Sequence, residues 1–185
     1  MPTSKPQFTS KEELRKRARK NIEDGAVTQG YKGDREKVIE LLNEALATEL
    51  VCVLRYKRHY FSAKGIVSES IAEEFHQHAA EEQEHADQIA ERITQLGGEP
   101  DMDPRKIADR AHSEYTEGKS LVEMIREDLV NERIAIDSYA ELIRFVGDDD
   151  TTTKRMLEEI LAKEEEHASE FADLLATIDP SKPTG

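Results

Sequence analysis

The sequence lacks the features that would place it among disulfide-rich or membrane-spanning proteins. It has one cysteine, Cys52, in 185 residues, so no disulfide can form within the chain. No apolar run is long enough to cross a bilayer, and no apolar segment of the kind that directs secretion lies near the amino terminus. We therefore expect a soluble, cytoplasmic protein with no membrane partner.

Aromatic residues are scarce as well. They make up 5% of the chain and include no tryptophan, whereas charged residues make up 36% and hydrophobic residues 37%. This composition is typical of long helices that have one buried stripe and a solvated outer face. The length suits one domain of ordinary size around one hydrophobic core.

Positive charge is scarce outside the first 20 residues. The formal net charge is -14, which opposes binding of the whole molecule to nucleic acid and suits a protein that collects cations. Within residues 1–20, seven Lys or Arg against two Glu give +5, which leaves -19 for the rest. We expect residues 1–33 to form a basic extension with a short helix, because Ser10 and Glu13 have capping-box spacing; this helix should end near Gly25. The extension could bind DNA phosphates, or it could be a solvated helix.

Four longer segments show the 3.6-residue apolar period of amphipathic helices. Asp34 and Ser120 are suitable amino-terminal caps for the first and third of them. The predicted helices span about 35–64, 68–96, 121–146 and 151–178. Short turns join the helices of each pair, whereas the connection of about 24 residues between the pairs can cross the length of a bundle. This order predicts an all-α protein with a ferritin-like antiparallel four-helix bundle over 34–177 and a flexible tail over 178–185.

A Glu-x-x-His motif occurs twice on the inner stripes of these helices. A single stripe glutamate precedes the two copies by 33 and 32 residues. The i, i+3 spacing points both side chains of a motif to the same helix face. One copy would be weak support for a metal site, but two copies at nearly equal spacing indicate two related helical hairpins. The six residues are Glu49, Glu82, His85, Glu132, Glu164 and His167.

The chemistry of these side chains favours metal binding. Four carboxylates inside a bundle would be very costly without cations, and two divalent ions would balance their charge. Carboxylates with two imidazoles form the ligand set of ferritin-like di-iron proteins, and the absence of thiolate argues against structural zinc. We therefore predict a two-metal site, with iron preferred and manganese possible. Glu81 and Glu84 fall off the inner line and are expected to be solvated.

Residues 34–177 resemble the ferritin-like superfamily, and bacterioferritin in particular. The matching segments are Ala45 to Val51, Glu82 to Asp87, Asp128 to Glu132 and Glu164 to His167. The resemblance implies a ferroxidase centre with two Fe ions in each subunit. It also implies that Fe(II) is oxidised by O2 or H2O2 and that the ferric product is stored as mineral in a hollow shell.

The resemblance also implies a role for each ligand. Glu82 and Glu164 would bridge the two irons. One iron site would be completed by Glu49 with His85, and the other by Glu132 with His167.

Three departures from bacterioferritin narrow this expectation. Gln83 stands where bacterioferritins have their haem-ligating methionine, so haem is not expected. Only 18 residues follow His167, so the fifth helix of 24-subunit ferritins is missing and a homo-oligomer of 12 subunits is favoured. The amino-terminal segment resembles the extensions of Dps-like mini-ferritins, which protect DNA, although the ordinary mini-ferritin site lies between subunits.

Four further residues are expected near the site. Tyr56 and Tyr139 each follow a site glutamate by seven residues; Tyr56 could orient a ligand, supply an electron or only pack, and Tyr139 should pack with a hydrogen bond. Cys52 could be oxidisable, but a small buried hydrophobe is the favoured interpretation. His78, four residues before Glu82, could guide iron or bind a third ion, although a polar core neighbour is favoured.

Three functions remain open. An iron-storing ferroxidase is the preferred one. A di-iron or di-manganese peroxidase or catalase would use similar ligands, although a rubrerythrin-like peroxidase needs an electron donor and the chain has no Cys-x-x-Cys domain. A Dps-like DNA-coating shell protein is the third.

Overall fold

The protein is an all-helical bundle. The structure, a computed structural model, describes residues 8–63 and 68–178, and no strand occurs in these ranges. The bundle consists of α2 (Arg35–Ser62), α3 (Ser68–Gln95), α5 (Leu121–Val146) and α6 (Thr151–Ile178). The flanking elements are α1 (Lys11–Arg17), the 3-10 helix η1 (Ile22–Asp24) and α4 (Ile107–Arg110).

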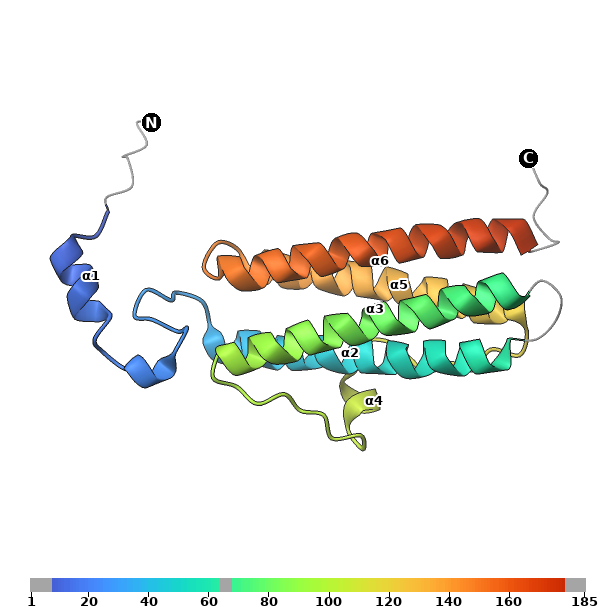
Figure 1. The fold of residues 1–185 in the computed structure, drawn as a ribbon, viewed down its shortest axis with the longest axis horizontal. Coiled ribbons are helices and arrows are strands. Elements are labelled where there is room, and N and C mark those ends of the chain that lie inside the picture. Colours follow the sequence, from blue (N-terminus) through green and yellow to red (C-terminus); the bar gives the residue numbers. More distant parts are fainter. Residues whose placement is uncertain (1–7, 64–67, 179–185) are drawn as a thin grey trace.

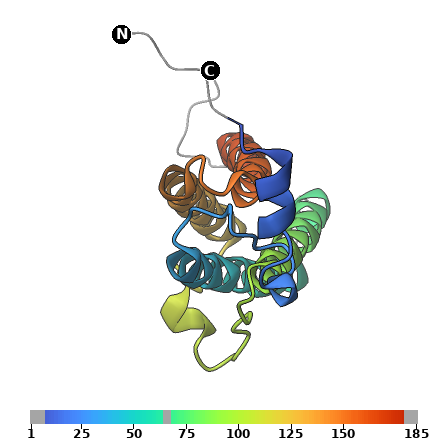
Figure 2. The same ribbon diagram turned by 90° about the vertical axis from the view of Figure 1, so that its left-hand side faces the viewer.

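The four long helices form two antiparallel hairpins, α2 with α3 and α5 with α6 (Figure 1). The connection between them carries α4 and runs along the outside of α2, from one end of the bundle to the other (Figure 1). The end-on view in Figure 2 shows the four helices at the corners of the bundle, with α4 outside it. This arrangement confirms the predicted ferritin-like fold. In the described ranges, no helix is long and apolar enough to cross a membrane.

Side-chain caps begin three of the helices as predicted. Ser10, Asp34 and Ser120 each accept a hydrogen bond from the backbone N–H three residues further on, at 3.1 to 3.2 Å. The amino-terminal helix is shorter than expected. It ends at Arg17 rather than near Gly25, and the backbone of Asn21 then adopts a left-handed conformation with φ 49°.

Two expectations fall on other parts of the chain. The predicted end of the first long helix near residue 64 lies outside the described residues. Of the predicted tail 178–185, residue 178 ends α6, and the remainder also lies outside the described residues.

The apolar core is divided into two clusters. The first contains Leu42, Leu46, Ile89, Ile93, Ile160 and their neighbours, and the second contains Tyr56, Phe75, Ile125, Phe171 and theirs. Along each long helix, one cluster gives way to the other at a buried glutamate. The middle of the bundle is therefore polar but is closed to water at both ends by packed hydrophobic side chains.

A buried ion pair ties α2 to α5 beside the second cluster. Arg55 Nε lies 2.9 Å from Asp128 Oδ1, and both side chains are at most 1% exposed. His59 Nδ1 lies 2.8 Å from the other oxygen of Asp128. The crossover takes part as well, because the carbonyl oxygen of Glu114 accepts from Arg55 and that of Thr116 lies 3.2 Å from His59 Nε2. This network fixes the path of the connection against the bundle.

A second network attaches the segment before α2 to the end of the bundle. The Tyr31 hydroxyl donates to Asp150 Oδ2 at 3.1 Å, and burial together with Asp150 raises the pKa of Tyr31 to about 12. Asp150 also pairs with Arg92 at 2.8 Å and accepts from the backbone N–H of Thr153 at the start of α6. One carboxylate therefore caps α6, neutralises Arg92 and holds the amino-terminal segment.

Candidate metal centre

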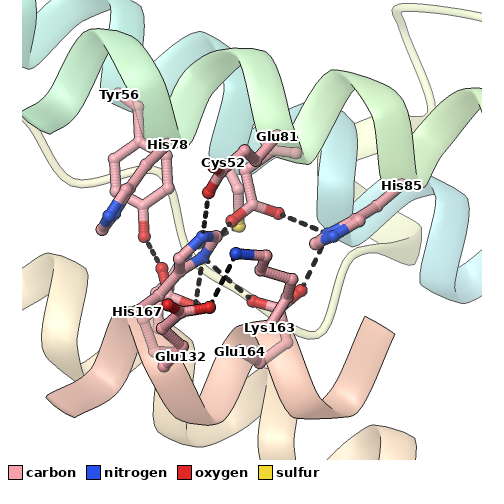
Figure 3. A network of polar contacts seen from close by, with 12 residues as sticks. Cys52, Tyr56, His78, Glu81, His85, Glu132, Lys163, Glu164 and His167 are labelled. Atoms are coloured by element: carbon pink, nitrogen blue, oxygen red, sulfur yellow. Dashed lines mark hydrogen bonds and ion pairs between the residues drawn. The ribbon is translucent and has the colours of Figure 1, made fainter. Parts of the chain in front are cut away.

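The structure brings the six predicted ligands together in the middle of the bundle. One glutamate comes from α2 and one from α5, whereas α3 and α6 each contribute a glutamate and a histidine. Each of the six is at most 5% exposed. Figure 3 shows the side chains of α3 and α6 reaching across the bundle toward one another.

Four of these side chains surround His85. Its Nδ1 atom lies 3.0 Å from Glu164 Oε1, 3.5 Å from Glu49 Oε2 and 3.7 Å from Glu82 Oε2. Each of the four residues can offer one ligand atom, all within 4.8 Å of one another. This spacing would allow a single metal ion to contact all of them.

A second group surrounds His167. Its Nδ1 atom lies 3.3 Å from Glu82 Oε1, 3.7 Å from Glu164 Oε2 and 3.9 Å from Glu132 Oε2. Glu82 and Glu164 belong to both groups, and each turns one oxygen toward each histidine. Shared carboxylates of this kind are what two adjacent cations need in order to be bridged.

Several of the converging atoms have no hydrogen-bond partner. They are Glu49 Oε2, Glu82 Oε1, His85 Nδ1, both carboxylate oxygens of Glu164, and His167 Nδ1. Buried polar atoms are almost always paired in proteins, because an unpaired one costs roughly 1–3 kcal/mol. Oxygen and imidazole donors in this number fit two divalent iron or manganese ions.

Protonation of the site shows how its charge is balanced without metal. Burial, reinforced by the charge of neighbouring carboxylates, raises the pKa of Glu49 and Glu132 well above the ordinary value. Burial opposes protonation of His85, but hydrogen bonds to the surrounding carboxylates win and raise its pKa to about 12. The pKa of His167 rises to about 11 for the same reason. Despite burial, hydrogen bonds from its neighbours hold the pKa of Glu82 well below its usual range. Imidazolium protons thus occupy the place of metal charge.

This balance predicts that metal binding releases protons. At pH 7, His85 and His167 are both protonated in the metal-free protein, and a histidine must be neutral to bind a metal. We therefore expect binding to release at least about two protons per subunit and affinity to rise with pH. Calorimetric titration with Co(II) in buffers of different ionisation enthalpy measures the released protons. Affinity that stays constant between pH 6 and pH 8 would contradict this charge balance.

Two buried tyrosines reach the centre from opposite hairpins. The Tyr56 hydroxyl, on α2, donates to Glu132 on α5, and the Tyr139 hydroxyl, on α5, donates to Glu49 on α2. The predicted hydrogen bond of Tyr139 is thus present, and Tyr56 makes the equivalent contact. Burial and the charge of Glu49 raise the pKa of Tyr139, so this phenol stays protonated as a donor.

Other neighbours differ in how far the sequence indicated them. Glu81 was expected to be solvated, yet its Oε2 lies 2.6 Å from His167 Nε2 and leaves Nδ1 of that ring facing the centre. The only hint in the sequence is its position beside Glu82. Cys52 is buried, accepts a hydrogen bond from Asn131 at 3.1 Å, and has a pKa raised by burial, which fits the interpretation as a small buried residue.

The fold and this site together define a ferritin-like protein. A family model described as "Ferritin-like domain" matches residues 39–180. The chain belongs to this family.

Particular relatives include both branches indicated by the sequence. The chain is 28% identical over 147 residues to a bacterioferritin of Desulfovibrio desulfuricans, covering 78% of each chain. It is 32% identical over 155 residues to the DNA protection during starvation protein of Pyrococcus furiosus, covering 82% of each. Among solved structures, a dodecameric thioferritin of Bacteroides fragilis, described as a bacterioferritin-related protein, has a TM-score of 0.76 at 34% identity, over 80% of this chain and 89% of that one.

Proposed function

We propose that the protein is a ferroxidase that oxidises Fe(II) with O2 or H2O2 and stores the ferric product inside a shell of identical subunits. The observation that carries this proposal is the sharing of Glu82 and Glu164 between two four-residue groups. Bacterioferritin relatives support it, and one solved bacterioferritin, 27% identical with a TM-score of 0.71, is described as having a diiron site. Manganese remains the alternative metal.

The proposed roles of the ligands follow from the geometry. Glu82 and Glu164 would bridge two Fe(II) ions, and the two remaining pairs would each complete one ion's ligands. These pairs are Glu49 with His85 and Glu132 with His167. Four carboxylates offset the charge of two Fe(II) ions and favour the more highly charged Fe(III) product.

Two irons in one site can supply two electrons together. Each Fe(II) gives up one electron; with two protons, the pair reduces H2O2 to two water molecules or O2 to H2O2. The buried surroundings keep bulk water from the site. The net charge of -14 would favour the arrival of Fe(II) cations at the protein.

We further propose that the subunits assemble into a 12-membered shell. The support is the dodecameric relative with a TM-score of 0.76. The described part of the chain contains no helix after α6, which ends at Ile178. A hollow assembly would provide the space in which ferric mineral accumulates.

Aerobic titration of the metal-free protein with Fe(II) tests the proposal. We expect a fast rise in ferric absorbance that saturates at two irons per subunit, followed by slower uptake in a particle of about twelve subunits by light scattering. Binding without oxidation above the protein-free rate, in a small oligomer, would contradict the proposal. That outcome would favour the peroxidase or catalase alternative, for which the Mn(II)-loaded protein would be assayed with H2O2.

The tyrosines allow a test of the ligand geometry. Tyr56→Phe and Tyr139→Phe each remove one hydroxyl donor from a proposed ligand, Glu132 or Glu49. Partners of this kind orient ligands, so each change should lower metal affinity or the oxidation rate about 10–100-fold. Stopped-flow oxidation over a range of Fe(II) concentrations separates the two effects. If both variants match the wild type, the phenols only pack.

Contact with DNA through the basic extension is the second candidate. Five basic side chains of this segment are exposed: Lys11, Arg15, Lys16, Arg19 and Lys20. Such contacts would be independent of sequence and weakened by salt. A mobility-shift assay at low and high salt, with and without residues 1–24, tests the idea. Equal shifts for the two proteins would remove it.

A further inference from the structure

A third group of metal-ligating side chains lies beside the centre, toward solvent. His78 Nε2 lies 2.9 Å from Glu170 Oε2 and 3.8 Å from Glu74 Oε1. All three residues can offer a ligand atom within 4.8 Å of one another. Glu74 and His78 are one turn apart on α3, and Glu170 faces them from α6, so the group spans the same two helices as the centre.

His78 links this group to the centre. Its side chain is fully buried, and its Nδ1 atom is a buried polar atom with no hydrogen-bond partner. Its ring stacks on that of His167, with 4.0 Å between ring centroids, and Figure 3 shows His78 next to His167. His78 also forms a candidate metal-binding group with Glu132 and His167. A buried imidazole that faces carboxylates on one side and proposed metal ligands on the other is hard to explain as packing alone.

The two carboxylates face solvent, unlike those of the centre. The side chains of Glu74 and Glu170 are 32% and 39% exposed, so a hydrated cation can reach them. They carry like charges within one small group, and burial together with the charge of Glu170 raises the pKa of Glu74. A divalent cation would relieve this repulsion.

We propose that Glu74, His78 and Glu170 bind a third divalent cation between solvent and the two-metal centre. Two carboxylates would neutralise the ion, and the imidazole supplies a donor suited to Fe(II), Mn(II) or Co(II). The site holds Fe(II) on its way to the centre. This delivery role rests on the proposed function, whereas binding of the cation does not.

Co(II) is a suitable probe because it is stable in air. Equilibrium dialysis of the metal-free protein should give three Co(II) per subunit, and crystals soaked in Co(II) should show an anomalous peak between the three side chains. In Glu170→Gln the count should fall to two and this peak should vanish. The matched control is Glu165→Gln, which changes an exposed glutamate on the same helix and should keep all three ions.

The centre and the third site can be separated by a further variant. In Glu132→Gln, the peak at Glu74, His78 and Glu170 should persist even though the centre is altered. Two Co(II) per wild-type subunit with no peak at these residues, or three in Glu170→Gln, would overturn the inference. If the peak is present while wild-type protein fails to oxidise Fe(II), then the proposed function fails and the third site remains.

Discussion

Glu132→Gln should lower the rate of fast Fe(II) oxidation by more than about 100-fold while leaving the metal-free fold intact. Loss of a residue that merely supports a metal ligand costs about 10–100-fold, so loss of a charged ligand should cost more. The glutamine side chain has the shape of a protonated glutamate, and it can still accept from the Tyr56 hydroxyl. Burial raises the pKa of Glu132, so the metal-free protein already holds this residue in its neutral form.

This combination separates a functional role from a structural one. With a chelator present, the melting temperature of the variant should stay within a few degrees of the wild type, since a neutral group replaces a neutral group. With metal present, the wild type should gain more stability than the variant, because ligand binding stabilises the folded state. The control is Glu141→Gln, an exposed glutamate on the same helix, which should oxidise Fe(II) normally. Normal oxidation by Glu132→Gln would place the reaction elsewhere, for example on the protein surface.

Asp128→Ala should cause the largest loss of stability of any single change considered. Asp128 is fully buried and is paired with Arg55, which is 1% exposed. Removing one partner of a buried pair leaves the other charge uncompensated, at a cost of about 3–5 kcal/mol. For a chain of this size, that corresponds to a fall of roughly 6–20 °C in melting temperature. The crossover should loosen as well, because His59 contacts both Asp128 and the carbonyl oxygen of Thr116.

Calorimetry of the metal-free protein measures this effect. Asp128→Asn keeps an oxygen acceptor but loses the charge, so its melting temperature should lie between those of the alanine variant and the wild type. Asp137→Ala removes an exposed aspartate from the same helix and should change stability by less than about 0.5 kcal/mol. A melting temperature for Asp128→Ala within 2 °C of the wild type would show that the pair contributes nothing to the fold.

The bundle could be predicted because its signals are local. Apolar period, caps and turn residues each depend on neighbours within a few positions, and the bounds of the long helices agree with them closely. The convergence of the six proposed ligands also follows from periodicity, since all six lie on inner stripes. The extension was less predictable. The left-handed backbone at Asn21 shortened its helix, and no apolar stripe indicated where it should end.

Contacts between hairpins could not be predicted in the same way. Glu81 lies off the inner line of α3, and only the approach of α6 brings it to His167. Arg55 and Asp128 resemble solvated charges in the sequence, yet the crossover covers them. The exchange of hydrogen bonds between the tyrosines and the glutamates of opposite hairpins likewise depends on distances that helical period does not specify.

The most direct test of the two-metal centre is anomalous diffraction at the iron edge from crystals loaded with Fe(II) in the absence of oxygen. We predict two peaks among the six side chains, about 3.5–4 Å apart, one beside His85 and the other beside His167. Glu82 and Glu164 should contact both peaks. A single peak there, or iron bound only at surface carboxylates, would contradict the account.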